Sequence, residues 1–478
     1  MNILQVNTDD VAGGAASVAR GLQEGLRARG HRCWMAVGVR RSGEEDALTI
    51  DNDRYRSLWA RGCIRTASLL DPLRGKFPGP GRLYTWIKLG LASPRRYWQI
   101  GEGKEDFDYP ATARLLELPP ARPDVLHLHN LHGGYFDLRA LPSLSRKLPV
   151  FVTLHDPWLL GGHCAHPFLC ERWKTGCGVC PDLTLYPAVR KDATAFNWQR
   201  KAEIYAASRL YLAAPSRWLM DRIEQSMLMP AVGEARVIPH GVDLSVFHPR
   251  DKGSLKRRLG IEPKRRVLLY AASDGPANPY KDFQTLRRAV DRAARSLESG
   301  NLLFIALGKE GQSEWIGNAE IRYVSFERSR KAMAAYYQAA DLYLHAAKAE
   351  TFCLAIAESM ACGTAVVATR VGAIPELVAD RETGLMVPPG DWEGMARAIV
   401  ALLENDGQRR RLASRAAEVA KARFDRARMI EEYEKWYFEI LRRRRQTTSA
   451  ARPPPIGRRS QGFMGEGAER GLAGAEDR

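Results

Sequence analysis

Short apolar runs alternate with amphipathic helical stretches through the first half of the chain. The clearest helical stretch follows the first run, and Gly30 ends it. Its apolar positions, spaced by three and four, include Ala16, Ala19, Leu22 and Leu26. Buried strands that alternate with helices are typical of a parallel sheet covered on both faces. The strands expected in this first domain, residues 1–248, are Asn2 to Val6, Cys33 to Val37, Val125 to His129, Val150 to Leu154 and Leu210 to Ala213.

The same alternation begins again after a break near residue 240. Pro239, Gly241 and Pro249 rule out a continuous helix across this break, so we expect a domain boundary there. The pattern predicts an α/β protein with two doubly wound parallel-sheet domains that face a central cleft. The strands expected in the second domain, residues 249–425, are Val267 to Ala272, Leu302 to Leu307, Ile321 to Val324, Leu342 to His345, Ala365 to Ala368 and Gly384 to Val387.

A long terminal helix is predicted after the second domain, over residues 426–445. Ile430, Tyr433, Tyr437 and Ile440 share one of its faces, and we expect it to cross back to the N-terminal domain. Few apolar residues follow, and three consecutive prolines begin at Pro453. Residues 446–478 are therefore expected to be a disordered tail.

The alternation breaks down in an insert over residues 54–98. This insert carries ten Lys or Arg residues and a single acid, Asp71, interleaved with tyrosines, tryptophans and a phenylalanine. A basic, aromatic and partly amphipathic segment suits contact with an anionic membrane surface. A solvated loop over the domain is an equal alternative at this point.

The composition is compatible with several kinds of binding partner. The 478 residues carry a formal net charge of +17, which favours anionic partners such as nucleic acid, an anionic membrane or a phosphorylated substrate. The N-terminus lacks the pattern of a secretion signal, and no apolar run of eighteen uncharged residues is present. We therefore expect a cytoplasmic protein, with any membrane contact peripheral and on the inner face of the plasma membrane.

Half of the eight cysteines fall in one loop, residues 156–181. Cys164, Cys170, Cys177 and Cys180 suit a closed tetrahedral zinc site, because the last pair has the spacing of a zinc knuckle. Such a zinc ion would be structural and would hold the loop over the cleft. Reduced free thiols and disulfides are the alternatives.

The segment from Glu350 to Glu358 carries the most specific chemistry. A loop is predicted to end near Phe352, a helix to follow, and Gly363 to stop that helix before a buried strand. A helix N-terminus offers free backbone N–H groups to phosphate or sugar oxygens. The two carboxylates would lie at different depths along the helix start, where each suits hydrogen bonds to hydroxyl groups. Alternatively, Glu350 is a cap and Glu358 a solvated residue.

This segment resembles the E-x7-E signature of glycosyltransferase family 4. The resemblance covers most of the chain and includes the Met-Ala-Cys-Gly turn that ends at Gly363, the interdomain segment from Ile238 to Asp243, and Gly13-Gly14 before an amphipathic helix. It implies a GT-B fold and transfer of a hexose from a UDP- or GDP-sugar with retention of the anomeric configuration. The acceptor would be a saccharide or a polyprenyl-linked saccharide.

The resemblance also implies roles for single residues. Lys281 and backbone N–H groups near Phe352 and Leu354 would meet the donor diphosphate, so catalysis would require no metal cofactor. Glu358 would bind the ribose. The remaining implied site residues are Gly13 and Gly14 on the donor side, and Glu350 and His155 at the transferred sugar.

The chain departs from the family pattern at two places. Cys353 stands where the family commonly has a glycine beside the donor sugar. The arginine that commonly precedes the lysine is missing before Lys281, so Asn278 is the expected substitute and Arg217 another candidate.

The cysteine-bearing loop resembles that of a subset of the family that acts in bacterial exopolysaccharide synthesis, the colanic-acid type. A GT-B sugar-nucleotide epimerase is the second hypothesis, but the E-x7-E segment argues against it. A zinc-containing nucleic-acid-binding protein is the third. It is disfavoured because the basic residues are spread along the chain and the cysteine loop lacks a basic recognition helix, so no nucleic-acid partner is expected.

Overall fold

The computed structural model describes residues 1–73, 76, 80–272, 278–297, 301–308, 310–325, 327 and 329–450, with side chains as far as 446. The N-terminal domain is built on a parallel seven-stranded sheet of order β3-β2-β1-β4-β5-β6-β7. In its register Ile3 lies between Cys33 and Val125. Its strands are β1 Asn2–Asp9, β2 Arg32–Val39, β3 Ala47–Thr49, β4 Val125–Leu128, β5 Val150–Thr153, β6 Leu210–Ala214 and β7 Val232–Val237.

Helices separate most of these strands, as the sequence pattern predicts. In α1, Ala16, Ala19, Leu22 and Leu26 are buried, and Gly30 follows the helix with a positive φ of 85°. The α-helices of the domain outside the insert are α1 Gly13–Ala28, α5 Leu141–Lys147, α6 Thr194–Ala206 and α7 Arg217–Glu224. Its 3₁₀ turns are η1 Asp53–Tyr55, which overlaps the start of the insert, and, outside the insert, η4 Pro110–Glu117, η5 Leu138–Ala140, η6 Pro157–Leu160, η7 Arg172–Lys174 and η8 Met229–Ala231.

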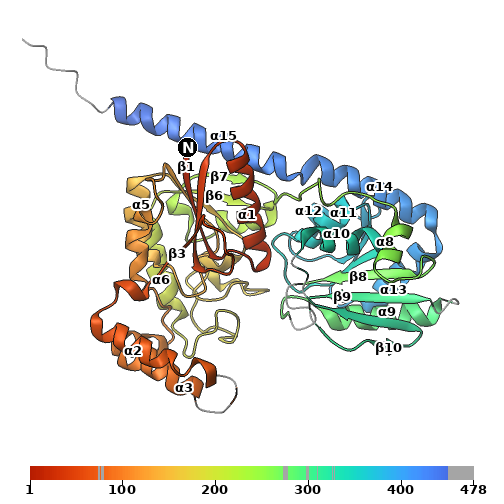
Figure 1. The fold of residues 1–478 in the computed structure, drawn as a ribbon, viewed down its shortest axis with the longest axis horizontal. Coiled ribbons are helices and arrows are strands. Elements are labelled where there is room, and N and C mark those ends of the chain that lie inside the picture. Colours follow the sequence, from red (N-terminus) through yellow and green to blue (C-terminus); the bar gives the residue numbers. More distant parts are fainter. Residues whose placement is uncertain are drawn as a thin grey trace, which may run out of the picture.

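The C-terminal domain is built on a second seven-stranded sheet, of order β10-β11-β9-β8-β12-β13-β14. All its pairings are parallel except β10 with β11. The prediction of two doubly wound parallel-sheet domains is confirmed (Figure 1). The strands are β8 Arg266–Ala271, β9 Leu302–Leu307, β10 Glu314–Ile316, β11 Ala319–Val324, β12 Leu342–His345, β13 Ala365–Thr369 and β14 Gly384–Val387. The helices are α8 Lys252–Arg258, α9 Phe283–Ser296, α10 Arg330–Ala339, α11 Leu354–Ala361, α12 Ile374–Leu377, α13 Trp392–Glu404 and α14 Asp406–Arg423.

The last helix, α15 (Arg426–Ala450), leaves the C-terminal domain and lies along the N-terminal one (Figure 1). Its apolar face packs on the first sheet and on α1, where Trp436 is fully buried against Phe151. Two of its tyrosines also reach polar groups of the sheet. Tyr433 Oη lies 2.7 Å from Thr153 Oγ1, and Tyr437 Oη lies 2.6 Å from His127 Nδ1. The helix continues past its expected end at residue 445, and residues 451–478 of the expected tail lie outside the described residues.

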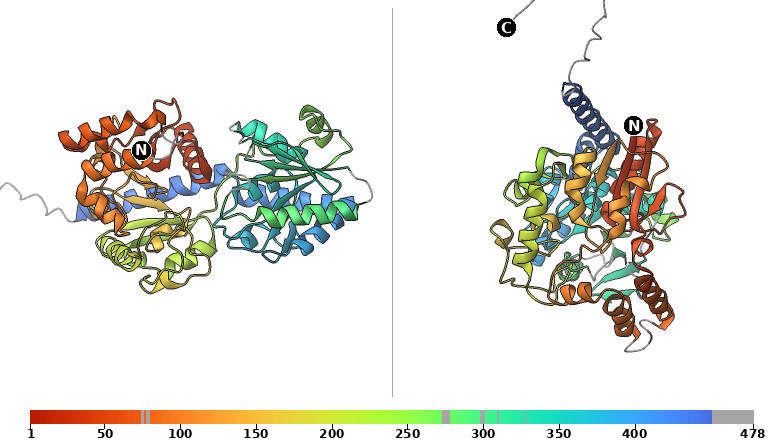
Figure 2. Two further views of the ribbon diagram at one scale, coloured as in Figure 1. Left: turned by 90° about the horizontal axis from the view of Figure 1, so that it is seen from below. Right: turned by 90° about the vertical axis from the view of Figure 1, so that its left-hand side faces the viewer.

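The insert folds into helices rather than a loop. They are α2 Leu58–Ser68, the 3₁₀ turn η2 Asp71–Leu73, α3 Pro80–Thr85, the π-helical turn η3 Trp86–Leu91 and α4 Pro94–Gly101. The helices α2 and α3 project from the N-terminal domain on the side opposite α15 (Figures 1 and 2). The phenylalanine of the insert, Phe77, lies outside the described residues.

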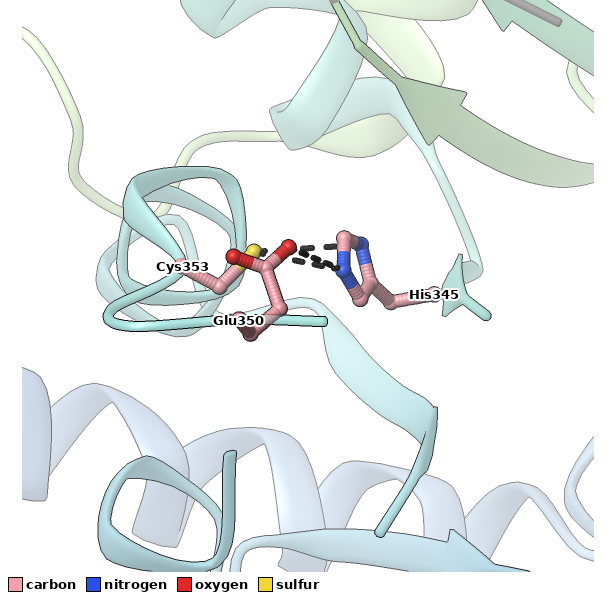
Figure 3. A group of neighbouring side chains, drawn as sticks. All are labelled: His345, Glu350 and Cys353. Atoms are coloured by element: carbon pink, nitrogen blue, oxygen red, sulfur yellow. Dashed lines mark hydrogen bonds and ion pairs between the residues drawn. The ribbon is translucent and has the colours of Figure 1, made fainter. Parts of the chain in front are cut away.

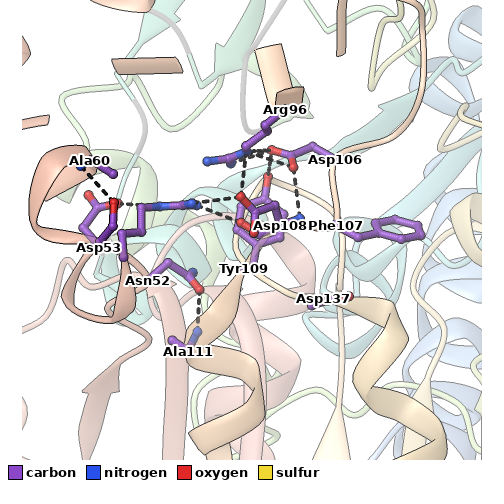
Figure 4. A network of polar contacts seen from close by, with 12 residues as sticks. Asn52, Asp53, Ala60, Arg96, Asp106, Phe107, Asp108, Tyr109, Ala111 and Asp137 are labelled. Carbon is purple, nitrogen blue, oxygen red and sulfur yellow. Dashed lines mark hydrogen bonds and ion pairs between the residues drawn. The ribbon is translucent and has the colours of Figure 1, made fainter. Parts of the chain in front are cut away.

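Ion pairs tie both ends of the insert to the domain (Figure 4). Near its end, Arg96 donates to both carboxylate oxygens of Asp106, at 2.5 to 3.0 Å. Near its start, Arg56 donates to the Asp108 carboxylate at 2.9 Å. The insert therefore has a fixed root.

Candidate active site

A cluster of buried polar side chains lies at the carboxyl end of β12 in the second sheet (Figure 3). His345 is the last residue of β12, and Glu350 follows five residues later in the loop. His345 Nε2 lies 2.8 Å from Glu350 Oε1, and the Lys281 ammonium forms an ion pair with the same oxygen. Because the carboxyl ends of parallel strands open onto the ligand crevice, this position suits a binding site.

The cluster holds Glu350 ionised. Burial works against the charge, but Lys281 and His345 outweigh it and lower the pKa of Glu350 to about 2. The same carboxylate, opposing the effect of burial, keeps the pKa of Lys281 above its ordinary value. Both groups are therefore charged at neutral pH.

Cys353 lies against this cluster at the start of α11. Its Sγ is 3.6 Å from His345 Nε2, and burial raises the pKa of the thiol well above its ordinary range. Ligand-type atoms of His345, Glu350 and Cys353 lie within 4.8 Å of one another, as in a metal site. The Lys281 ammonium, however, already occupies the carboxylate oxygen that a cation would need. The set is therefore better described as a polar cluster around an ion pair.

The helix α11 begins directly beside the cluster, as the sequence predicts. Its N-cap residue, Cys353, makes no side-chain capping hydrogen bond, so the N-terminal N–H groups near Phe352 and Leu354 remain suited to an anionic ligand. Close by, Gly372 has a φ of 55°, and a Cβ there would lie 1.9 Å from the carbonyl oxygen of Glu350. A glycine at 372 therefore lets the two loops meet.

Glu358 occupies a different environment within α11. Burial raises its pKa to about 7, and Arg330 and the Tyr337 hydroxyl offset only part of that shift. Since the pKa of Glu350 is about 2, the two carboxyl groups differ in both place and protonation. Glu350 precedes α11 and Glu358 lies inside it, which agrees with the expectation that they lie at different depths along the helix start.

His155 approaches the same region from the N-terminal domain. It follows β5, and its ring stacks on that of His240 with centroids 4.9 Å apart. The His240 ring in turn meets Phe352 edge to face at 5.1 Å. The His155 backbone carbonyl accepts a 2.6 Å hydrogen bond from Thr351 Oγ1. His155 is thus connected directly to the loop that carries Glu350.

Gly13 and Gly14 begin α1 on the N-terminal side of the same junction. Gly13 has a φ of 87°, and a Cβ on Gly14 would lie 3.5 Å from Leu354 Cδ1. The glycine loop therefore approaches the first turn of α11 across the domain junction.

One of the two proposed substitutes for the missing arginine is engaged elsewhere. Arg217 is half exposed and bonded to Asp221 and Glu224 of its own helix, so it does not reach the Lys281 cluster. Asn278 lies three residues before Lys281, and its Oδ1 accepts from the Tyr280 N–H at 3.0 Å within the same turn, a bond that does not use the N–H donors of its amide. The five residues that precede Asn278 lie outside the described residues.

The cysteine loop crosses the cleft above these groups. Phe168 stacks on Tyr280 of the C-terminal domain at 5.9 Å, and His166 stacks on Trp218 of α7 at 5.7 Å. The loop therefore touches both sides of the junction.

The four cysteines of this loop are free, and no three of their sulfurs gather within 4.8 Å. Without a metal ion, burial raises the pKa of Cys164 to about 12 and of Cys177 to about 11, whereas a thiol that coordinates zinc loses its proton. One polar contact is suggestive of a ligand pair, since Cys180 Sγ lies 3.3 Å from His163 Nε2. This geometry alone does not form a tetrahedral site. Structural zinc stays a prediction, which metal analysis of freshly reduced protein decides.

A second link joins the domains beside the site. Glu376, at the start of α12, accepts from the backbone N–H groups of Arg217 and Trp218 at 2.8 and 2.7 Å. Ser216 Oγ donates to the Thr351 carbonyl at 2.8 Å. A carboxylate of one domain therefore caps a helix of the other.

Comparisons with known proteins agree for both domains. The model described as Glycosyltransferase Family 4 matches residues 12–246, and the model described as Glycosyl transferases group 1 matches residues 265–405. A D-inositol 3-phosphate glycosyltransferase from Nocardioides sp. is 32% identical over 65% of this chain and 76% of that protein. The putative colanic acid biosynthesis glycosyl transferase WcaC of Escherichia coli is 24% identical over 79% of this chain and 85% of that protein.

A further relative matches over a shorter span. The N-acetyl-alpha-D-glucosaminyl L-malate synthase of Bacillus anthracis is 28% identical over 42% of this chain, and the match spans about half (52%) of that protein's length.

Solved structures share the fold at low identity. Anabaena HepE in complex with UDP and glucose has a TM-score of 0.57 at 16% identity and covers 91% of this chain and 98% of its own. WaaG, a glycosyltransferase involved in lipopolysaccharide biosynthesis, has a TM-score of 0.54 at 15% identity, covering 90% and 98%. The two doubly wound domains thus define a GT-B glycosyltransferase. Within that class, the chain belongs to glycosyltransferase family 4.

The contacts of three residues at the site were not expected from the sequence. His345 was recognised only as the end of a strand, His240 only as part of the interdomain segment, and Glu376 was given no role. The position of His345 at a strand's carboxyl end is a signal that could have identified it. The Glu376 contact carries no such signal, because its partners are backbone N–H groups far away in the sequence.

Proposed function

We propose that this glycosyltransferase moves a hexose from a UDP- or GDP-sugar to a saccharide or polyprenyl-linked saccharide, with retention of configuration, in bacterial exopolysaccharide or lipopolysaccharide synthesis. The observation that carries the proposal is the cluster of Lys281, Glu350 and the α11 N-terminus beside His155. The presence of UDP in HepE and the naming of WcaC for colanic acid biosynthesis support the donor and the pathway class.

The donor diphosphate would bind between Lys281 and the start of α11. Lys281 supplies a full positive charge, and the helix N-terminus supplies N–H groups and the positive end of a dipole. Both stabilise the negative charge that grows on the leaving nucleoside diphosphate. In the free protein Glu350 neutralises the ammonium, so a bound diphosphate would share Lys281 with that carboxylate.

The transferred sugar would lie between Glu350 and His155. Glu350 remains ionised at neutral pH and can accept hydrogen bonds from sugar hydroxyls. Glu358, deeper along α11, would accept from the ribose hydroxyls. Catalysis in this arrangement depends on positioning and charge stabilisation.

Replacement of Glu358 tests the assignment. Glu358→Ala is expected to lower kcat/KM by about 100-fold, which corresponds to about 2.7 kcal/mol of transition-state binding. The fold should remain intact, because the change removes a carboxyl group whose ionised form is disfavoured by burial. Donor binding is measured as thermal shifts with a panel of nucleotide sugars, and turnover as release of the nucleoside diphosphate. Glu382→Ala, an exposed carboxylate on the same domain, is the control. Full activity of Glu358→Ala would refute the assignment.

We also propose that the insert places the acceptor side of the enzyme on an anionic membrane. Its buried core is small, formed by Ala60, Cys63 and Ala92, so large apolar side chains remain outside. Leu58 is 82% exposed, Trp59 67% and Leu69 76%. Basic residues surround them, and tryptophans at such a boundary favour the membrane interface. No helix among the described residues is long and apolar enough to span a membrane.

Vesicle binding tests the membrane contact. Leu58→Ser with Trp59→Ala should weaken cosedimentation with phosphatidylglycerol vesicles about tenfold or more, because each buried apolar group and each nearby cation contributes about 1 kcal/mol. Trp315→Ala is the matched control, since Trp315 is 66% exposed on the other domain. Equal binding of the double variant and the wild type, or wild-type binding as strong to neutral vesicles, would contradict the proposal.

A further inference from the structure

A chain of three hydrogen-bonded side chains runs across neighbouring strands of the first sheet, from the middle of β1 to the carboxyl ends of β4 and β5. Gln5 is on β1, His129 follows β4, and His155 follows β5. The Gln5 amide lies 2.8 Å from His129 Nε2, and His129 Nδ1 lies 3.0 Å from His155 Nε2. Gln5 is fully buried and His129 is 2% exposed, so these hydrogen bonds are shielded from water.

Backbone groups decide which end of the Gln5 amide faces His129. The terminal atom that lies 2.8 Å from His129 Nε2 also lies 3.1 Å from the Ala19 carbonyl oxygen, and the other terminal atom lies 3.1 Å from the Gln23 N–H. A carbonyl oxygen only accepts and an N–H only donates. The atom facing His129 is therefore the amide nitrogen. Cys33 Sγ, 3.4 Å from the amide, fits either orientation because a thiol can donate or accept.

The orientation of Gln5 fixes the position of two protons further along the chain. Because the amide donates to His129 Nε2, that nitrogen must be unprotonated, and a neutral His129 carries its proton on Nδ1. His129 then donates from Nδ1 to His155 Nε2. A neutral His155 therefore carries its proton on Nδ1.

Both rings are neutral at physiological pH. Burial lowers the pKa of His155 to about 4 and that of His129 well below its ordinary value. His155 Nδ1 has no hydrogen-bond partner within the described part of the chain, and the residue is partly exposed at the junction. The free nitrogen is thus available to a ligand.

We propose that Gln5 and His129 are positioning residues that hold His155 in its Nδ1–H tautomer, so that it presents an N–H donor, and not a lone pair, to an oxygen atom of the bound ligand. His155 then binds a sugar or phosphate oxygen and does not act as a base through Nδ1. Only the identity of that oxygen rests on the proposed function. The tautomer itself is a property of the free protein.

Nitrogen-15 spectra of histidine-labelled protein without donor test the tautomer directly, with His155→Asn to assign the signals. The wild type should show one His155 species, protonated at Nδ1. Gln5→Met removes the amide donor and should give a second, Nε2-protonated His155 species, together with about a tenfold fall in kcat/KM. Gln23→Met is the matched control, because Gln23 is also buried and bonded only to the Cys33 carbonyl by its side chain.

The outcomes separate this proposal from the glycosyltransferase assignment. A wild-type His155 protonated at Nε2, or a Gln5→Met variant whose His155 signals are unchanged, overturns the positioning role whatever the substrate is. A tautomer shift in Gln23→Met equal to that in Gln5→Met also overturns it, because the effect would then be general repacking. Failure to turn over any nucleotide sugar would instead contradict the proposed function and leave the spectra to decide the tautomer.

Discussion

Glu350 and Glu358 carry the same chemical group, but their neighbours give the two carboxyls different protonation behaviour. Burial raises the pKa of both. At Glu350 a lysine and a histidine reverse the effect, whereas at Glu358 Arg330 and Tyr337 offset only part of it. The charge at each position is therefore set by residues that come from other elements.

The raised pKa of Glu358 predicts a pH-dependent effect on stability. In the folded protein Glu358 keeps its proton up to about pH 7, whereas in the unfolded chain it releases the proton near pH 4.5. The free energy of unfolding therefore falls as the pH rises from about 4.5 to 7, and this group causes no further loss above pH 7. Glu358→Gln removes the effect. The melting temperature of the variant minus that of the wild type should increase from pH 4.5 to 7.5, measured by thermal unfolding in a pH series. A difference that stays constant across the series would contradict the assignment.

Among the secondary-structure elements, burial decided which ones could be predicted from sequence. The central strands are continuous apolar runs, and α11 is bounded by Glu350 and Gly363, so pattern alone located them. The edge strand β7 alternates partly buried and exposed positions and contains Gly233, and β3 has only three residues, so neither gave a clear signal. The helices of the insert were missed because their apolar residues face outward.

The residues of the site could be predicted from the sequence, but most of their contacts could not. The resemblance to the family placed Lys281, Glu350 and Glu358 in one cleft, but it gave no information on the partners of each group. Glu376 and the start of α7 are separated by 159 positions, and backbone N–H groups are present in almost every residue. A contact of this kind follows only from the relative placement of the two domains.

The Glu376 contact predicts a role for α7 in keeping the domains together. A carboxylate at a helix N-terminus contributes about 1 kcal/mol, so Glu376→Gln should weaken the contact between the two domains by about that amount. We expect kcat/KM to fall about fivefold, the unfolding midpoint to change little, and the radius of gyration in solution scattering to increase. Glu382→Gln serves as the control. An unchanged radius and unchanged kcat/KM would show that the contact does not hold the cleft.

At the scale of the whole molecule, α15 makes the two domains a single unit. The helix begins beside the interdomain segment, where a Cβ on Gly241 would lie 2.4 Å from the Arg426 Cα, and then covers the first sheet. Relative motion of the domains must therefore be accommodated near Gly241 and the start of α15.

Two aromatic residues on α15 provide a matched pair for testing this packing. Trp436 is fully buried, whereas Phe438 is 51% exposed on the same helix. Trp436→Ala should lower the free energy of unfolding of the N-terminal domain by about 3 to 5 kcal/mol, and Phe438→Ala by less than about 1 kcal/mol. Urea denaturation followed by circular dichroism measures both. Equal losses in the two variants would show that the helix is not docked through its Trp436 face.

The crossing of α15 also determines the order in which the chain can fold during synthesis. The N-terminal domain is made first, but the helix that covers one face of its sheet follows the complete C-terminal domain in the chain. While the ribosome makes the intervening residues, the apolar face around Phe151 has no permanent cover. The N-terminal domain can therefore complete its core only after the C-terminal domain has been made.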